Sequence, residues 1–136
     1  MELFTGLGGL ARFRDARRRR EASWDHSGGN ADYVTIAPGA THRLAEMDGP
    51  GCVRHIWITL ASPETRYPRR SVLRAWWDGA ATPCIEAPAG DFFGVGHGLT
   101  PEYWSLPLTM SPRSGRGFNS FWPMPFNRSG VVEVTN

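Results

Sequence analysis

The chain has 136 residues, of which 40% are hydrophobic and 21% charged. This is enough for one domain with a hydrophobic core and too little for two, so it excludes a disordered tail, a collagen-like repeat and a multidomain enzyme. Sixteen Gly and eleven Pro argue against an all-helical bundle, because they shorten every element. The net charge of +2 is small.

The N-terminal residues carry helical spacing. Leu3, Leu7, Leu10 and Phe13 fall on one face, which predicts a helix from Leu3 to Ala22 and an N-terminal helical segment over residues 1–22. Its end holds the arginines at positions 17–20. We interpret this run as a solvated helix end, favourable near the negative pole of the helix dipole. A nucleic-acid reader is the weaker alternative, because the rest of the chain is nearly charge-balanced, and we expect no nucleic-acid partner.

Residues 23–136 are predicted to form one all-β domain, in which short apolar or alternating runs are separated by Gly, Pro and Asp turns. Asp78-Gly79 reads as a hairpin turn. The stretch from Gly94 to Gly117 is predicted to be a long loop. The predicted strands are Tyr33 to Ile36, Thr41 to Met47, Cys52 to Ala61, Val72 to Trp77, Cys84 to Ala87, Gly117 to Trp122 and Val131 to Thr135.

Several common kinds of site have no support. The glycines from Gly94 to Gly98 lack phosphate-loop spacing, and the four histidines lack metal-ligand spacing. There is no GxSxG elbow. We therefore expect neither a cofactor nor a metal. Cys52 and Cys84 are expected to be small buried thiols in a reducing compartment.

No segment suggests a membrane partner. Apolar stretches such as Ile56 to Ala61 are far shorter than the ~20 residues that span a bilayer. The first ten residues lack a basic n-region and a small-residue cleavage site, so they do not resemble a signal peptide. We expect a cytoplasmic protein.

Three segments combine polar side chains with Gly, Pro and aromatics, at residues 24–30, 90–94 and 116–126. Sugar sites use this mixture, because carboxylates and amides bind hydroxyls while aromatic faces stack on the apolar side of the ring. Other roles are equally consistent with the composition. Asp25 and Asn30 would then cap turns, Asp91 would satisfy loop amides, and the aromatics would belong to the core.

The order of motifs resembles glycoside hydrolase family 172, formerly domain of unknown function 2961. The resemblance covers nearly the whole chain from Leu7 onward. It rests on Ser23-Trp24-Asp25-x-x-Gly28-Gly29-Asn30-x-Asp32, Gly49-Pro50-Gly51-x-x-x-His55-Ile56-Trp57, Leu73-Arg74-x-x-Trp77-Asp78-Gly79, Gly90-Asp91-Phe92-Phe93-Gly94-x-Gly96-His97-Gly98 and Arg116-Gly117-Phe118-Asn119-x-x-Trp122-Pro123-Met124-Pro125-Phe126.

The resemblance implies a jelly-roll sandwich, the first of two in tandem, here with a short N-terminal helix. It implies action on α-D-fructofuranosides, difructose anhydrides or α-D-arabinofuranosides with retention of configuration, by two carboxyl groups about 5 Å apart. In the family these glutamates lie in the second half, so we expect this chain alone to be inactive. A homo-oligomer through jelly-roll contacts is also implied. A non-catalytic carbohydrate-binding or assembly module is the alternative.

Resemblance and residue chemistry together give the candidate substrate-binding residues. Asp91 is the one carboxylate whose setting suggests desolvation, and we expect it to support the site rather than to be the nucleophile. The final run, Val131 to Asn136, is an alternating strand without a polar tail, so the domain is expected to be incomplete at its C-terminus. The candidates are Asp25, Asn30, Asp91 and Asn119 for hydroxyls, Trp24 or Trp122 for stacking, and Arg116 for orienting a carboxylate.

Overall fold

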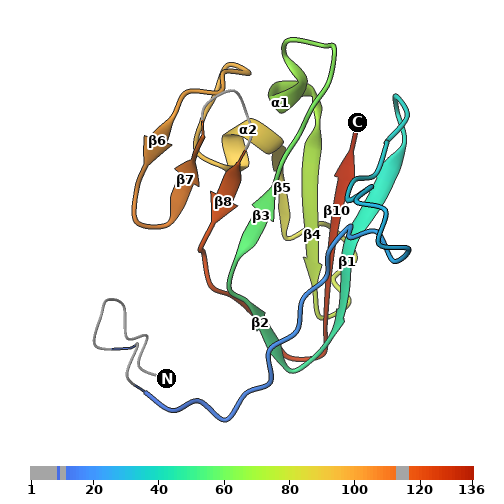
Figure 1. Cartoon of the computed structure of the whole chain (residues 1–136). Helices are drawn as coiled ribbons and strands as arrows, with labels where there is room; N and C mark the ends of the chain where they lie inside the picture. Colours follow the sequence, from blue (N-terminus) through green and yellow to red (C-terminus); the bar gives the residue numbers. More distant parts are fainter. Residues whose placement is uncertain (1–8, 10–11, 113–116) are drawn as a thin grey trace.

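The computed structural model describes residues 9, 12–112 and 117–136 and is predominantly antiparallel β-structure (Figure 1). Two helices of one turn each, α1 (Tyr67–Arg70) and α2 (Ala89–Phe92), interrupt the strands. The strands are β1 (Thr41–Asp48), β2 (Gly51–Val53), β3 (Ile56–Ile58), β4 (Val72–Trp77), β5 (Ile85–Pro88), β6 (Tyr103–Trp104), β7 (Leu108–Met110), β8 (Phe118–Ser120), β9 (Met124–Phe126) and β10 (Ser129–Thr135).

The strands form two four-stranded sheets joined by a short ribbon. Sheet A has the order β1-β10-β4-β5, sheet C has the order β3-β8-β7-β6, and β2 pairs with β9 between them. Figure 1 shows sheet C on the left, sheet A on the right and β2 crossing below. The predicted all-β sandwich is therefore confirmed.

One antiparallel ribbon runs through both sheets. Residues 41–58 pair with residues 118–135 in three successive blocks, β1 with β10, β2 with β9 and β3 with β8. Pairing of the first strands with the last is how a jelly roll is wrapped. Inside this outer ribbon, β4 pairs with β5 and β6 with β7, each with its neighbour in the chain.

The core lies between the sheets. Alternation along β4 and β10 turns Leu73, Ala75 and Val132 inward from sheet A. Met110 and Phe118 meet them from sheet C, and both are fully buried. Phe93, just after α2, fills the end of the core, with its ring centroid 5.5 Å from that of Phe118. The hydrophobic contacts between the layers stabilise the sandwich.

The Asp78-Gly79 turn is confirmed and does more than reverse the chain. Both residues have positive φ, 59° and 78°, which Asp tolerates and Gly favours. The Oδ1 atom of Asp78 accepts hydrogen bonds from the backbone N–H groups of Asn127, Arg128 and Ser129 at 2.6–3.3 Å. These bonds lower the pKa of Asp78, the amide of Arg128 contributing most. The turn thus fixes the loop between β9 and β10.

Several strand predictions are confirmed, while others need correction. Thr41 to Met47 and Val72 to Trp77 match β1 and β4, and Val131 to Thr135 lies within β10. The predicted strand from Cys52 to Ala61 instead breaks into β2 and β3, because its two parts pair with different strands. The predicted long loop contains β6 and β7, which are too short to show alternation.

The helix and the strand predicted before residue 41 are not formed by the residues that the structure describes. Residues 33–36 form no strand, and residues 12–22 form no helix. The exposed ring of Phe13 shows why, because a helix of this length depends on packing of its apolar face. The remainder of the predicted helix, residues 1–8, 10 and 11, lies outside the described residues.

The expectation that both cysteines are buried is wrong. Cys52 and Cys84 are free thiols, but both are exposed rather than buried. The last strand, β10, is central in sheet A, with β1 on one side and β4 on the other. Among the described residues, no helix is long and apolar enough to cross a membrane.

Truncation of Phe118 tests the core. Replacing this fully buried ring by Ala is expected to lower the free energy of unfolding by about 3–5 kcal/mol, because apolar contacts are lost and a cavity remains. Phe13→Ala is the matched control and is expected to change stability by less than about 0.5 kcal/mol. Urea denaturation measures both, and a Phe118→Ala effect as small as the control would contradict this core.

Candidate functional site

The outer face of sheet C carries a row of side chains that crosses all four strands. Alternation buries Phe118 and Met110, so the intervening residues face outward. The register places Trp57 opposite Asn119, Asn119 opposite Thr109, and Thr109 opposite Trp104. We call these four residues the outer row.

The outer row has an aromatic residue at each end and polar residues in the middle. Trp57 is 55% exposed and Trp104 is 67% exposed. Three strand spacings separate their backbones, which is about 14 Å. Two open indole faces with an amide and a hydroxyl between them can stack on sugar rings and bind their hydroxyl groups.

A second set of contacts orients Asn119. Its Oδ1 atom lies 2.9 Å from Nε2 of His55, and with Oδ1 as acceptor the Nε2–H group donates. The His55 ring stacks on Phe121, with centroids 4.5 Å apart and planes 2° apart. With Oδ1 bound to His55, both N–H donors of the Asn119 Nδ2 group remain available for the hydroxyl oxygens of a ligand.

The pairing of β3 with β8 brings together residues from two of the motifs that carry the family resemblance. His55-Ile56-Trp57 lies in the first half of the chain, and Phe118-Asn119 lies near its end. Of the residues gathered here, sequence reasoning named Asn119 as a candidate and did not name His55, Trp57, Thr109 or Trp104. Trp57 stands between two isoleucines in a run that looked apolar on both faces, and Trp104 and Thr109 fall in the predicted loop.

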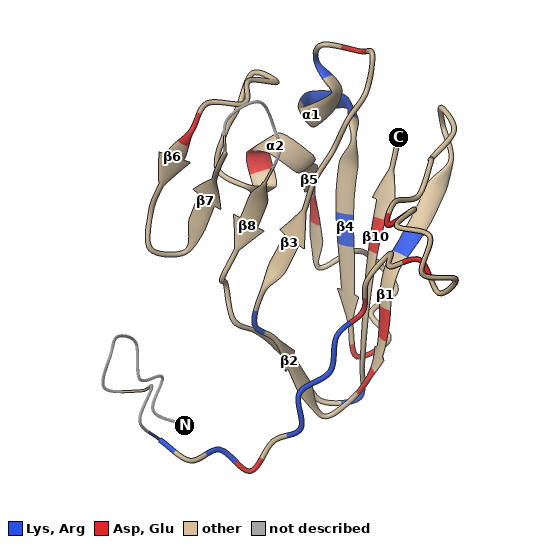
Figure 2. Cartoon of the chain, viewed as in Figure 1, with Lys and Arg blue, Asp and Glu red and all other residues tan. Residues whose placement is uncertain are grey.

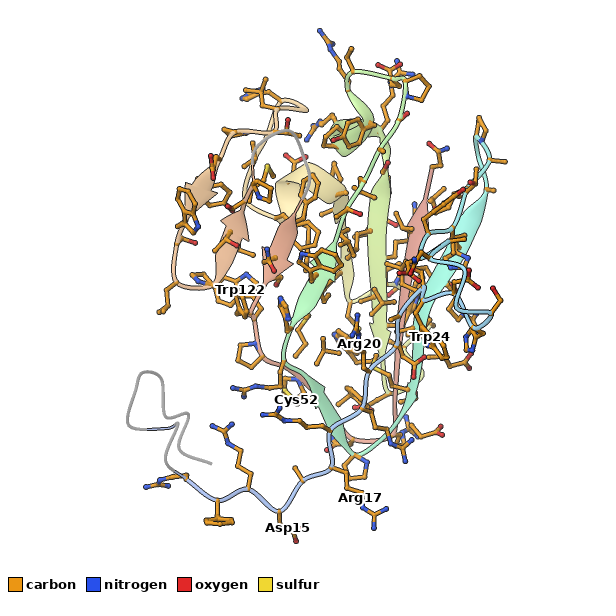
Figure 3. All side chains as sticks on the ribbon, in the orientation of Figure 1. Asp15, Arg17, Arg20, Trp24, Cys52 and Trp122 are labelled. Carbon is orange, nitrogen blue, oxygen red and sulfur yellow. The ribbon has the colours of Figure 1, made fainter. Side chains whose placement is uncertain are left out.

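The other predicted site residues are spread over the fold. Trp122 is half-exposed just beyond β8, and Figure 3 shows it at the lower end of sheet C, away from Trp24 beside sheet A. Arg116 lies outside the described residues. The structure therefore places Asn119 in sheet C, with Trp122 just beyond the end of β8, and leaves Trp24, Asp25, Asn30 and Asp91 elsewhere.

Asp25 closes a loop over residues 25–32. Its Oδ1 atom accepts from the Ser27 backbone N–H at 2.9 Å and the Ser27 hydroxyl at 2.7 Å, and its Oδ2 atom accepts from the Ala31 N–H at 3.1 Å. The Ser27 hydroxyl contributes most to lowering the pKa of Asp25. Asn30 has a φ of 61°, typical of a turn. These contacts favour the turn-capping alternative for Asp25 and Asn30.

Asp91 lies in α2 at the other end of the sandwich. Its Oδ2 atom is 2.7 Å from Nη1 of Arg69, and its side chain is 32% exposed. The expected desolvated setting is therefore not observed, because a guanidinium and solvent both reach this carboxylate. The ion pair links α2 to α1, which carries Arg69.

Many of the other acidic side chains are also engaged. Glu46 and Glu133 both bind Arg43, Glu86 binds Arg74, and the Asp78 carboxylate binds backbone amides. These carboxylates are therefore occupied by contacts within the fold. Within the part of the chain that the structure describes, no group of three or more His, Cys, Asp or Glu residues is placed to hold a metal ion.

A family model described as GH172 domain-like matches residues 29–136. The chain belongs to the GH172 domain-like family. The GH172 match includes both sheets and the whole outer row, whereas Trp24 and Asp25 precede it. No curated protein matches the chain.

The Asp25 loop gives a pH-dependent prediction. Because the folded pKa of Asp25 is lowered, its contribution to stability is present above the unfolded value of about 3.9 and is lost as pH falls through the folded pKa. Between pH 5 and 2, the amide proton resonances of Ser27 and Ala31 should therefore shift together. Asp25→Asn should abolish this joint transition, and its persistence in the variant would contradict the assignment.

Proposed function

We propose that this GH172 domain-like chain is the N-terminal part of a retaining glycoside hydrolase that acts on α-D-fructofuranosides, difructose anhydrides or α-D-arabinofuranosides. In this proposal the chain supplies substrate-binding residues and the catalytic glutamate pair lies outside it. The outer row of sheet C is the observation that carries the proposal, since it adds a sugar-binding arrangement to the family membership.

The outer row suits a furanoside chain. Trp57 and Trp104 offer apolar faces to the C–H side of two sugar rings, while Asn119 and Thr109 meet the hydroxyl groups between them. Because His55 fixes the Oδ1 side of Asn119, the Nδ2 donors are oriented before the ligand arrives. Such preorganisation lowers the entropy lost on binding.

The acidic residues support a binding role over a catalytic one. A retaining glycosidase needs one free carboxylate as nucleophile and one carboxyl group that holds a proton near neutral pH. In this chain the carboxylates of Asp25, Asp78 and Asp91 already bind amides, a hydroxyl or a guanidinium, so each is occupied by contacts within the fold.

The alternative is a carbohydrate-binding or assembly module without any associated chemistry. The same outer row favours it, because stacking surfaces of this kind need no catalytic partner. The hydrolase proposal includes a homo-oligomer held together by jelly-roll contacts, with active sites near the contacts between protomers. Activity of the longer protein that contains this chain, lost on Asn119→Ala, would favour the hydrolase over the module.

Hydrolysis by the isolated chain is the first test. The purified protein is expected to release no p-nitrophenol from p-nitrophenyl α-D-arabinofuranoside, since the proposal puts the carboxyl pair elsewhere. Circular dichroism checks that the chain is folded. Substantial turnover that disappears in a Glu→Gln variant of this chain would place the pair inside it and overturn the proposal.

Ligand binding at the outer row is the second test. Trp57→Ala and Trp104→Ala are each expected to weaken binding of an α-D-arabinofuranosyl oligosaccharide about five- to tenfold, as one stacking contact is lost. Isothermal titration calorimetry measures the change. Trp24→Ala is the matched control, because Trp24 is 57% exposed but lies outside sheet C, and its affinity should stay unchanged.

The control also separates two locations for the sugar. A loss of affinity in Trp24→Ala, with none in Trp57→Ala or Trp104→Ala, would place binding at the loop of residues 24–30 and contradict the assignment to the outer row.

A further inference from the structure

The outer face of sheet A carries a second row, and this one is charged. The register aligns Arg43, Glu133, Arg74 and Glu86 on four adjacent strands. Figure 2 shows blue and red bands alternating at one level of β1, β10, β4 and β5, whereas β3, β7 and β8 are uncoloured. Alternating charge suits cross-strand pairing in a sheet.

Each of these charged side chains forms an ion pair with a neighbour in the row. Arg43 binds Glu133 through Nε at 3.1 Å and Glu46 through Nη1 at 2.7 Å. Arg74 binds Glu86 through Nε at 2.6 Å and the Thr135 hydroxyl through Nη1 at 2.8 Å. Arg43 and Glu133 therefore place a guanidinium donor group and a carboxylate acceptor group side by side.

Next to these two atoms the sheet is hollowed. A depression of about 360 Å³ is lined by Arg43, Glu133, Trp76, Val131, Gly79 and Ala80. Trp76 and Val131 are register partners one step from the charged row, on the same face. The hollow arises because the turn after β4 supplies Gly79 and Ala80, which have little or no side chain, beside the large indole of Trp76.

We propose that this hollow binds a single neutral sugar ring and forms a second carbohydrate site of the chain, distinct from the outer row of sheet C. The indole of Trp76 stacks on the apolar face of the ring, while Arg43 donates to one hydroxyl and Glu133 accepts from its neighbour. The inference rests on the proposed function in one respect, which is the choice of a furanoside as the sugar to be tested.

The charges favour a neutral ligand over an anion. Arg43 already faces two carboxylates, Glu46 and Glu133, so an incoming phosphate or carboxylate would be repelled by both. Two neighbouring hydroxyl groups need one donor and one acceptor, and the guanidinium of Arg43 and the carboxylate of Glu133 are groups of these two kinds. Trp76 and Val131 contribute the apolar floor.

The experiment uses the full chain and two probes, methyl α-D-arabinofuranoside and methyl α-D-fructofuranoside. Titrations followed by ¹H–¹⁵N NMR are expected to shift the indole N–H of Trp76 and the Nε–H of Arg43 in a saturable way. Trp76→Ala should weaken the affinity reported at Arg43 about tenfold. Ala80→Arg, which fills the hollow from an exposed turn without removing a core group, should abolish the response at Trp76.

Two variants separate this site from the proposed function. Trp57→Ala should leave the Trp76 and Arg43 responses unchanged, and Trp24→Ala should alter neither site. Responses at Trp76 without any at the Trp57 indole would sustain the second site and count against the outer row. No saturable response at Trp76, or an unchanged response in Ala80→Arg, would overturn the second site whatever happens at sheet C.

Discussion

The antiparallel pairing of residues 41–58 with residues 118–135 is the constraint on which the rest of the structure depends. It places β10 in the middle of sheet A and β8 in the middle of sheet C, so one ribbon supplies central strands to both layers. Because strand pairing fixes which side chains share a face, the same ribbon determines the core between the sheets and both outer surfaces. Loss of its register would turn inward residues such as Phe118 toward solvent.

The two outer surfaces have different chemistry on the same scaffold. Sheet C presents indoles around an oriented amide, and sheet A presents paired charges around a hollow floored by Trp76. Both surfaces combine an apolar face with hydroxyl-binding groups, which is what a sugar ring requires. Under the two proposals, a ligand long enough to reach both surfaces would gain affinity from their linkage.

The sequence indicated the fold class well and the site only in part. Alternating runs such as Val72 to Trp77 are long enough to show a period of two, and the Asp78-Gly79 turn has its own residue preference. Strands β6, β7 and β9 have two or three residues, too few for a period to be recognised in the sequence. The outer row was missed because its members meet only through pairing between distant segments, and a single sequence does not reveal that register. Asn119 was a candidate by resemblance and residue chemistry and lies in the outer row, whereas Asp25, another candidate, binds groups of its own loop.

A crystal structure of the chain with a bound α-D-arabinofuranosyl oligosaccharide tests the central claim most directly. We predict density for at least two sugar rings over sheet C, one against Trp57 and one against Trp104, with a hydroxyl group bonded to Nδ2 of Asn119. Density confined to the loop of residues 24–30 or to the end of the sandwich around Asp91, with the outer row empty, would contradict the account.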